Sequence, residues 1–143
     1  MPYEYLEDAV TSDLTFRASG RDLDELFTAA ADATTNAMVG ALESVRPTIT
    51  LPVSVEADAL DILLMRFLDE IVFHKDAKKL LLRAAGVHVD GTAGAYRLAG
   101  VLRGEPIDPV RHELAADVKA VTLHGLRVER IPQGWEAQVT VDV

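Results

Sequence analysis

Hydrophobic and polar residues alternate most clearly at the end of the chain, over residues 135–143. A period of two with one apolar side is typical of a strand that is buried on one face. Trp135 opens the apolar side, whereas Asp142 lies on the polar side, one residue from the end. Residues 126–131 form a second strand-like run, and the Pro-Gln-Gly at 132–134 predicts a turn between the two. The pattern therefore predicts a hairpin in a sheet with one covered face.

Two strand patterns lie in the first part of the chain, after an extended start at residues 3–6. Residues 14–19 alternate, which places Asp13 on the side away from the core. Residues 49–55 alternate as well, but Pro52 lacks a backbone N–H. We therefore place this strand at an edge of its sheet or near a bulge.

A further hairpin is predicted in the second half of the chain. Residues 80–89 and 96–103 are strand-like, and the connection between them, 90–94, contains two glycines. Residues 105–117 contain two prolines, several charges and no clear period. They predict a loop with room for one helical turn.

The first helical pattern begins at Asp22, with Glu25 three residues further on. This spacing lets each carboxylate accept a hydrogen bond from a free backbone N–H. Apolar residues at helical spacing carry the helix to about Ser44, and Pro47 predicts a firm end.

The second helical pattern is the strongest in the chain, and Asp58 is its predicted N-terminal cap. The apolar stripe predicts a core helix that packs against the sheet. Lysines follow near its end, where cations suit the helix dipole. The stripe and these lysines are Leu60, Leu63, Leu64, Phe67, Leu68, Ile71 and Val72, then Lys75, Lys78 and Lys79.

Antiparallel hairpins around two helices with apolar stripes indicate an α+β fold, a mostly antiparallel sheet with two main helices packed on it. The alternating strands agree, because one face of such a sheet stays in contact with water. At 143 residues we expect a single domain over residues 1–143.

The composition excludes several classes of protein. Hydrophobic residues make up 49% of the chain, and cysteine is absent, which excludes disulfides and thiolate metal sites and favours the cytoplasm. No apolar run is long enough to cross a membrane, and residues 1–5 do not resemble a signal peptide, so we expect none. The net charge of −9 argues against direct binding to nucleic acid. It is compatible with a basic protein partner or a cation, or with solubility alone.

The motifs of common enzyme classes are missing. The sequence contains no GxGxxG, no GxxxxGK[ST] and no GxSxG. Its histidines, at positions 74, 88, 112 and 124, do not fall at metal-ligand spacings, which argues against a zinc site.

Carboxylates offer a more specific hypothesis, since Asp13 begins one strand and Asp142 ends another, both on the polar face. If these strands are neighbours, the two acids and the terminal carboxylate of Val143 meet. Three hard oxygen groups suit calcium, magnesium or manganese. The alternative is that Asp13 belongs to a turn and Asp142 is simply solvated.

Lys119 lies in an otherwise apolar run and is either an outward side chain of a strand or part of a site. Thr122 and His124 follow closely. In an extended segment these three residues do not share one face, so a bend near Thr122 is required to bring them together.

Several motifs together resemble the archease family over essentially the whole chain. The main one is Val-Lys-Ala-Val-Thr-Leu-His-Gly-Leu-Arg-Val-Glu at 118–129, followed by Gly-Trp-Glu-Ala at 134–137 and Val-Asp-Val at 141–143. Residues 13–20 are similar to the family's Asp-x-Gly-x-Arg-Ala-Tyr-Gly, with Thr15 for the glycine and Ser19 for the tyrosine. The family's usual histidine before this segment is Val10 here, and valine can neither ligate a metal nor shuttle a proton.

The resemblance implies a small cytoplasmic accessory protein of the RNA ligase RtcB, in tRNA splicing and RNA repair, that promotes guanylylation and turnover of the ligase and is not a ligase itself. It also implies a divalent cation held by Asp13, Asp142 and the Val143 carboxylate, and a functional role for Lys119. With Thr122 and His124, Lys119 forms the expected partner-associated group.

The sequence is compatible with two other functions. One is a small metal-dependent hydrolase that uses Asp13, Asp142 and His124. The other is a divergent archease-like binding or interaction domain, which Val10 favours.

Overall fold

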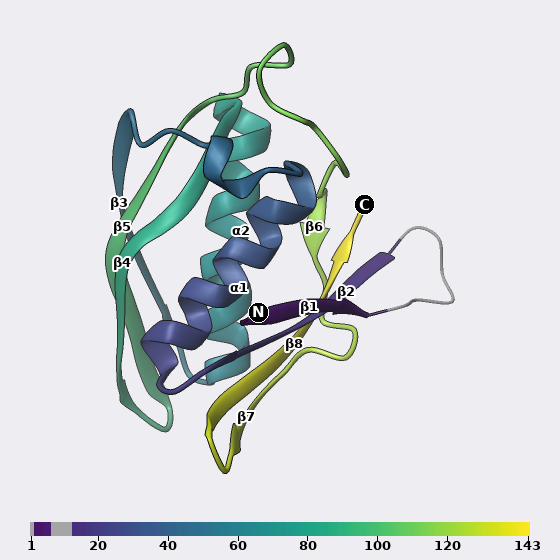
Figure 1. The fold of residues 1–143 in the computed structure, drawn as a ribbon. Helices are drawn as coiled ribbons and strands as arrows, with labels where there is room; N and C mark the ends of the chain where they lie inside the picture. Colours follow the sequence, from purple (N-terminus) through teal and green to yellow (C-terminus); the bar gives the residue numbers. More distant parts are fainter. Residues whose placement is uncertain (1, 7–12) are drawn as a thin grey trace.

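The structure, a computed structural model, describes residues 2–6 and 13–143. Figure 1 shows the described part of the chain as three layers, with two helices between a three-stranded and a five-stranded sheet. None of the described helices is long and apolar enough to span a membrane. The elements are β1 (Tyr3–Leu6), β2 (Asp13–Gly20), α1 (Leu23–Met38), a 3₁₀ turn (Leu42–Ser44), β3 (Ile49–Ala57), α2 (Leu60–Lys78), β4 (Leu80–Thr92), β5 (Ala95–Pro106), β6 (Ala120–Val121), β7 (Arg127–Ile131) and β8 (Gly134–Asp142).

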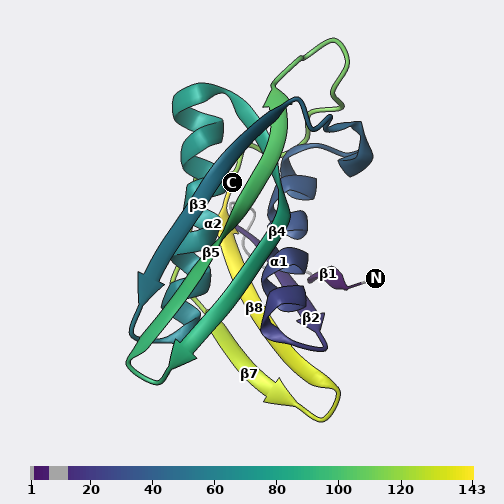
Figure 2. The same ribbon diagram turned by 90° about the vertical axis from the view of Figure 1, so that its left-hand side faces the viewer.

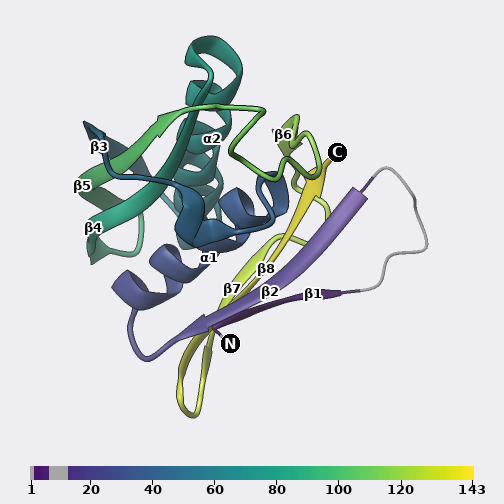
Figure 3. The same ribbon diagram turned by 45° about the horizontal axis from the view of Figure 1, so that its top comes forward.

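The larger sheet is built around β8, the strand predicted from the C-terminal alternation. Antiparallel β2 runs along one edge of β8, and β1 pairs with β2. On the other edge β7 pairs with the first part of β8, and the short β6 pairs with its end. The C-terminal end of β8 therefore lies between β2 and β6, a relationship that Figure 3 shows from above.

The smaller sheet has the order β3-β5-β4, with all its strands antiparallel (Figure 2). β3 is an edge strand, which confirms the position predicted from Pro52. β4 and β5 are longer than predicted, and only Ala93 and Gly94 separate them. Their register shifts between Ala84 and Gly86, where a bulge bends the strand.

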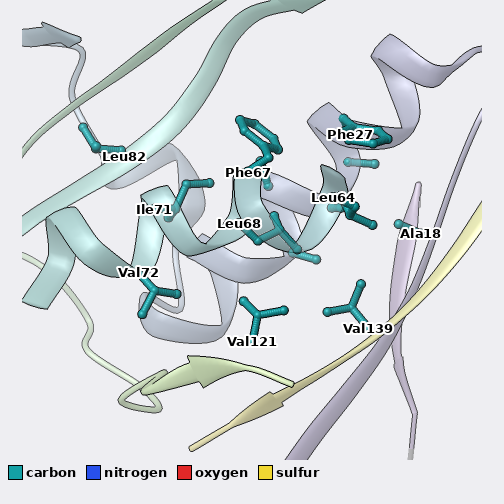
Figure 4. Close-up of a cluster of buried hydrophobic side chains, with 14 of the residues drawn as sticks. Ala18, Phe27, Leu64, Phe67, Leu68, Ile71, Val72, Leu82, Val121 and Val139 are labelled. Carbon is teal, nitrogen blue, oxygen red and sulfur yellow. The ribbon is translucent and has the colours of Figure 1, made fainter. Parts of the chain in front are cut away.

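The core fills the space on both sides of the two helices (Figure 4). Phe67 of α2 and Phe27 of α1 stack with their ring centroids 6.2 Å apart, and both side chains are completely buried. Leu82 reaches this core from the small sheet, whereas Val139 reaches it from the large sheet. Because α1 is covered by a sheet on each side, alanines occupy many of its buried positions and keep the layers close.

The predicted α+β class is confirmed, but two helix boundaries were wrong. α1 ends at Met38, short of Ser44, because the backbone after it leaves the helix to pair with a distant loop: Val39 bridges Leu114, and the Gly40 N–H donates to Glu113. Residues 42–44 form a separate turn.

The cap predicted for the second helix was also wrong. Ala59, not Asp58, is the N-cap of α2, and no side chain caps it. The backbone oxygen of Asp58 accepts from the Gly94 N–H at 3.1 Å and so holds the β4–β5 turn. At α1 the predicted start is correct, since Asp22 accepts from the Glu25 N–H at 2.8 Å.

Candidate functional site

Two carboxylates face each other at the end of the large sheet. Asp13 is the first residue of β2, Asp142 is the last of β8, and the antiparallel register pairs them directly. Directly opposite residues project from the same face, with Cβ atoms about 4.5–5.5 Å apart. Val143, the residue after Asp142, packs its side chain against the core.

A layer of threonines lies next to the two acids on the same face. Thr15 pairs with Thr140, and their hydroxyl oxygens are 2.8 Å apart, with both residues buried. Thr122 joins this layer from the third segment, because its N–H and its hydroxyl both donate to the Thr140 carbonyl at 3.0 Å. Buried hydrogen bonds of this kind fix the relative positions of the segments that carry the acids.

Lys119 enters the same corner from the strand on the other side of Asp142. Its backbone N–H donates to the carbonyl oxygen of Asp142 at 2.8 Å, and Ala120 lies opposite Asp142 in the register. Among the described residues, the Lys119 ammonium forms no ion pair with Asp13 or Asp142. It acts on Asp117, whose pKa it helps to lower.

The bend required at Thr122 is present. The Thr122 hydroxyl accepts from the N–H of His124 at 3.3 Å, and Gly125 follows with a positive φ of 66°. The structure therefore links Thr122 to His124 and to Thr140, and links Lys119 to Asp142. His124 and Lys119 are both exposed. Val10 lies outside the described residues.

The donor set at this corner consists of hard oxygen atoms. Within residues 2–6 and 13–143, no group of three or more His, Cys, Asp and Glu side chains could hold a metal ion. Asp13 and Asp142 are therefore the two acidic side chains that this corner offers, and further oxygen ligands would come from backbone carbonyls, hydroxyls or water. Two or three carboxylates completed by water fit calcium, magnesium or manganese, whereas a zinc site usually takes nitrogen or sulfur ligands.

Sequence reasoning missed Lys75, which is buried beside this corner. Its Nζ donates to the Val118 carbonyl and to the Asp117 carboxylate, both at 2.6 Å. A signal was available: Lys75 follows Ile71 by four residues and Val72 by three, so it continues the apolar stripe of α2. Its position near the helix end suggested only a dipole effect.

Comparison with known proteins places the chain in a family. The model of the archease protein family (MTH1598/TM1083) matches residues 3–143. The archease of Pyrococcus furiosus is 34% identical over 134 residues, which are 93% of this chain and 94% of the relative. That of Methanopyrus kandleri is 34% identical over 143 residues and the full length of both chains. The chain belongs to the archease family.

Solved structures agree with this assignment. The solution structure of Methanobacterium thermoautotrophicum protein 1598 has a TM-score of 0.83 and 30% identity, and the match covers 99% of each chain. The Thermotoga maritima protein described as an archease and possible chaperone has a TM-score of 0.62 over 98% of this chain and 99% of its own. At 15% identity, that second match shows a shared fold only.

Proposed function

We propose that this protein is a cytoplasmic accessory factor of an RtcB-type RNA ligase, one that promotes guanylylation and turnover of the ligase in tRNA splicing and RNA repair. The observation that carries the proposal is the direct pairing of Asp13 with Asp142 in a chain of the archease family. The description of the Thermotoga maritima relative as a possible chaperone is consistent with action on a protein partner.

A divalent cation is part of the proposal. Asp13, Asp142 and the Val143 carboxylate would hold it, and a bound cation supplies positive charge close to a phosphate. The contact between the Thr15 and Thr140 hydroxyls ties together the two strands that carry the acids, and the backbone hydrogen bond from Lys119 to Asp142 supports a role for that lysine at the same corner. Guanylyl transfer depends mostly on positioning and on stabilisation of phosphate charge, which is what an ordered corner of this kind can provide.

Docking on the ligase is expected to depend on charge. The chain carries a net charge of −9 and is therefore complementary to a basic protein that binds RNA. The same charge opposes direct binding of RNA to this protein. The accessory role therefore rests on contact between the two proteins.

The test is multiple-turnover RNA ligation by the host's RtcB-type ligase, with and without this protein. We expect the native chain to raise turnover and Asp142→Asn, which keeps the size of the side chain, to abolish the stimulation. Asp90→Asn, in the β4–β5 hairpin, removes the same charge elsewhere and should stimulate as the native chain does.

Each contrary result has a distinct meaning. A native chain that leaves ligase turnover unchanged would refute the ligase role. Stimulation by Asp142→Asn equal to that of the native chain would refute the acidic site. Turnover of a phosphate ester by this protein alone would favour a metal-dependent hydrolase instead.

A further inference from the structure

The buried ammonium of Lys75 has no part in the site described above, yet it binds the segment that leads into it. Lys75 projects from the last turn of α2, and its side chain is only 8% exposed. Nζ donates to the Val118 carbonyl and to the Asp117 carboxylate at 2.6 Å, and it also lies against Asp76. An ammonium has three hydrogens to donate, so these three partners satisfy it.

The strand that Lys75 supports is unusually short. β6 consists of Ala120 and Val121 and lies at the edge of the large sheet. A ladder this short fixes the chain only weakly, and α2 supplies additional contacts to β6. Asp69, nearly two turns before Lys75 on α2, interacts with the N–H of Val121. Burial raises the pKa of Asp69, and this contact with Val121 partly opposes the rise.

The charge of Lys119 acts on the same carboxylate that pairs with Lys75, that of Asp117. Lys75, Lys78, Lys79 and Lys119 are the only lysines of the chain. The hydrogen bond from Lys75 lowers the pKa of Asp117, and the charges of Lys119 and Lys79 lower it further. Asp117 therefore pairs with the buried Lys75 ammonium, and the charge of the exposed Lys119, two residues later, also acts on it.

Stability alone is a weak reason for such a pair. Taking an ammonium out of water is costly, and ion pairs with exposed carboxylates such as Asp117 and Asp76 contribute little to stability. The Lys75 ammonium fixes a backbone carbonyl and a neighbouring carboxylate in one arrangement, which an apolar side chain cannot do. The geometry is therefore better suited to ordering residues 117–119 than to stabilising the core.

We propose that Lys75 is a positioning residue of the accessory site: through Asp117 and Val118 it sets the place of Lys119 beside Asp142. The inference rests on the proposed function for its consequence in ligation, but the ordering itself is a property of this chain. Since Lys75 is buried, it does not touch the ligase. Its effect has to pass through Lys119.

The ordering is tested by amide hydrogen exchange on the isolated protein. In Lys75→Met we expect the N–H groups of Lys119 and Thr122, which donate to β8, to exchange roughly tenfold faster than in the native chain. Amides of β4 and β5 should be unaffected. Lys78→Met, an exposed lysine of the same helix turn, is the matched control and should leave exchange unchanged.

Asp117→Asn is the second variant, because it tests the same contact from a side chain that is 71% exposed and does not disturb the core. It should accelerate exchange at Lys119 in the same direction. Unchanged exchange at Lys119 and Thr122 in both variants would overturn the proposal. So would equal acceleration throughout the protein, because that reports a loss of global stability.

Ligation separates positioning from the proposed function. We expect Lys75→Met to lower the maximal stimulation of the ligase. The concentration of this protein that gives half-maximal stimulation should stay unchanged. The double variant with Lys119→Met should stimulate no less than Lys119→Met alone, since both changes act on one residue. If the losses of stimulation caused by Lys75→Met and Lys119→Met multiply in the double variant, Lys75 does not act through Lys119. If the native chain does not stimulate, the ligase role fails, and the exchange result alone decides whether Lys75 orders the segment.

Discussion

Asp13 lies directly opposite Asp142 in the register of β2 and β8, so two carboxylates share one face of the sheet at its end. Like charges placed directly opposite each other across a sheet are destabilising. Neighbouring threonines and the packed Val143 side chain hold the strands together at this point. A cation between the carboxylates would turn this unfavourable pair into a favourable one.

The pairing predicts a stability change that reverses with the cation. In chelator, Asp142→Asn should be more stable than the native chain by roughly 0.2–1 kcal/mol, because it removes the repulsion. With excess calcium, magnesium or manganese the native chain should become the more stable of the two, because it alone binds the ion. Thermal unfolding of both proteins, with each ion and with chelator, measures the reversal.

Asp90→Asn is again the control. Because it keeps Asp13 and Asp142, its unfolding temperature should respond to each ion as that of the native chain does. A native protein whose unfolding temperature does not respond to any of the three ions would contradict a cation site at Asp13 and Asp142.

Docking on the ligase should weaken as salt is added. The net charge of −9 attracts a basic partner over a distance comparable to the Debye length, about 10 Å at 0.1 M salt. We expect the dissociation constant to rise roughly tenfold between about 0.05 and 0.5 M sodium chloride, mostly through slower association. Surface-immobilised ligase and a salt series give both rates. Binding that stays constant across the series would rule out electrostatic docking.

Acid should loosen the loop after β5 through Glu105. The Glu105 side chain is buried and accepts hydrogen bonds from Arg111, the Arg46 N–H and His112. The His112 Nδ1 accepts from the Asp108 N–H, so the hydrogen lies on Nε2, which faces Glu105 at 3.0 Å. Burial alone would raise the pKa of Glu105, but these bonds outweigh it and lower the pKa to about 2.

Because the pKa of Glu105 is lowered, its carboxylate stabilises the folded protein at pH values above its ordinary pKa of 4.5. This stabilisation is lost as the pH falls toward 2. Glu105→Gln should cost about 3 kcal/mol at neutral pH, because Arg111 and His112 lose their charged partner. The difference from the native chain should shrink between pH 4.5 and 2. Denaturant unfolding at several pH values measures it, with the exposed Glu113→Gln as control. A difference that does not change with pH would contradict this role.

Two glycines should respond differently to alanine. A Cβ on Gly134, where φ is 146°, would lie 2.2 Å from the carbonyl oxygen of Gly20. Gly94 has a φ of 93°, but no atom lies within 4 Å of the added carbon. We expect Gly134→Ala to cost more than about 2 kcal/mol and Gly94→Ala about 1 kcal/mol, from backbone strain alone. Urea unfolding compares them, and equal losses would show that the close approach of β8 to Gly20 is not rigid.

Local patterns in the sequence predicted most of the secondary structure. Alternation at residues 135–143 located β8, and Pro52 correctly placed β3 at an edge. The Asp22 cap was visible from its spacing to Glu25. These features depend on neighbouring residues, whose sequence separation sets which face they share.

The ends of elements were less predictable where distant segments competed for the backbone. α1 stops at Met38 because residues 113–116 take the hydrogen bonds that a longer helix would use, as Ala115 does with the Met38 carbonyl. Asp58 looked like a cap, but its backbone is occupied by Gly94. Neither competitor lies near its target in the sequence.

The sequence by itself determined the class of fold, the hard oxygen chemistry available at the chain's end and the exclusion of thiolate sites. Only the tertiary structure decided that Asp13 meets Asp142, that Thr122 bends back to Thr140, and that Lys75 is buried against Val118. Strand pairing and register join residues from opposite ends of the chain, and periodicity carries no information about which strands become neighbours. The position of the candidate site therefore follows from long-range pairing, although the sequence predicts the two strands that carry Asp13 and Asp142.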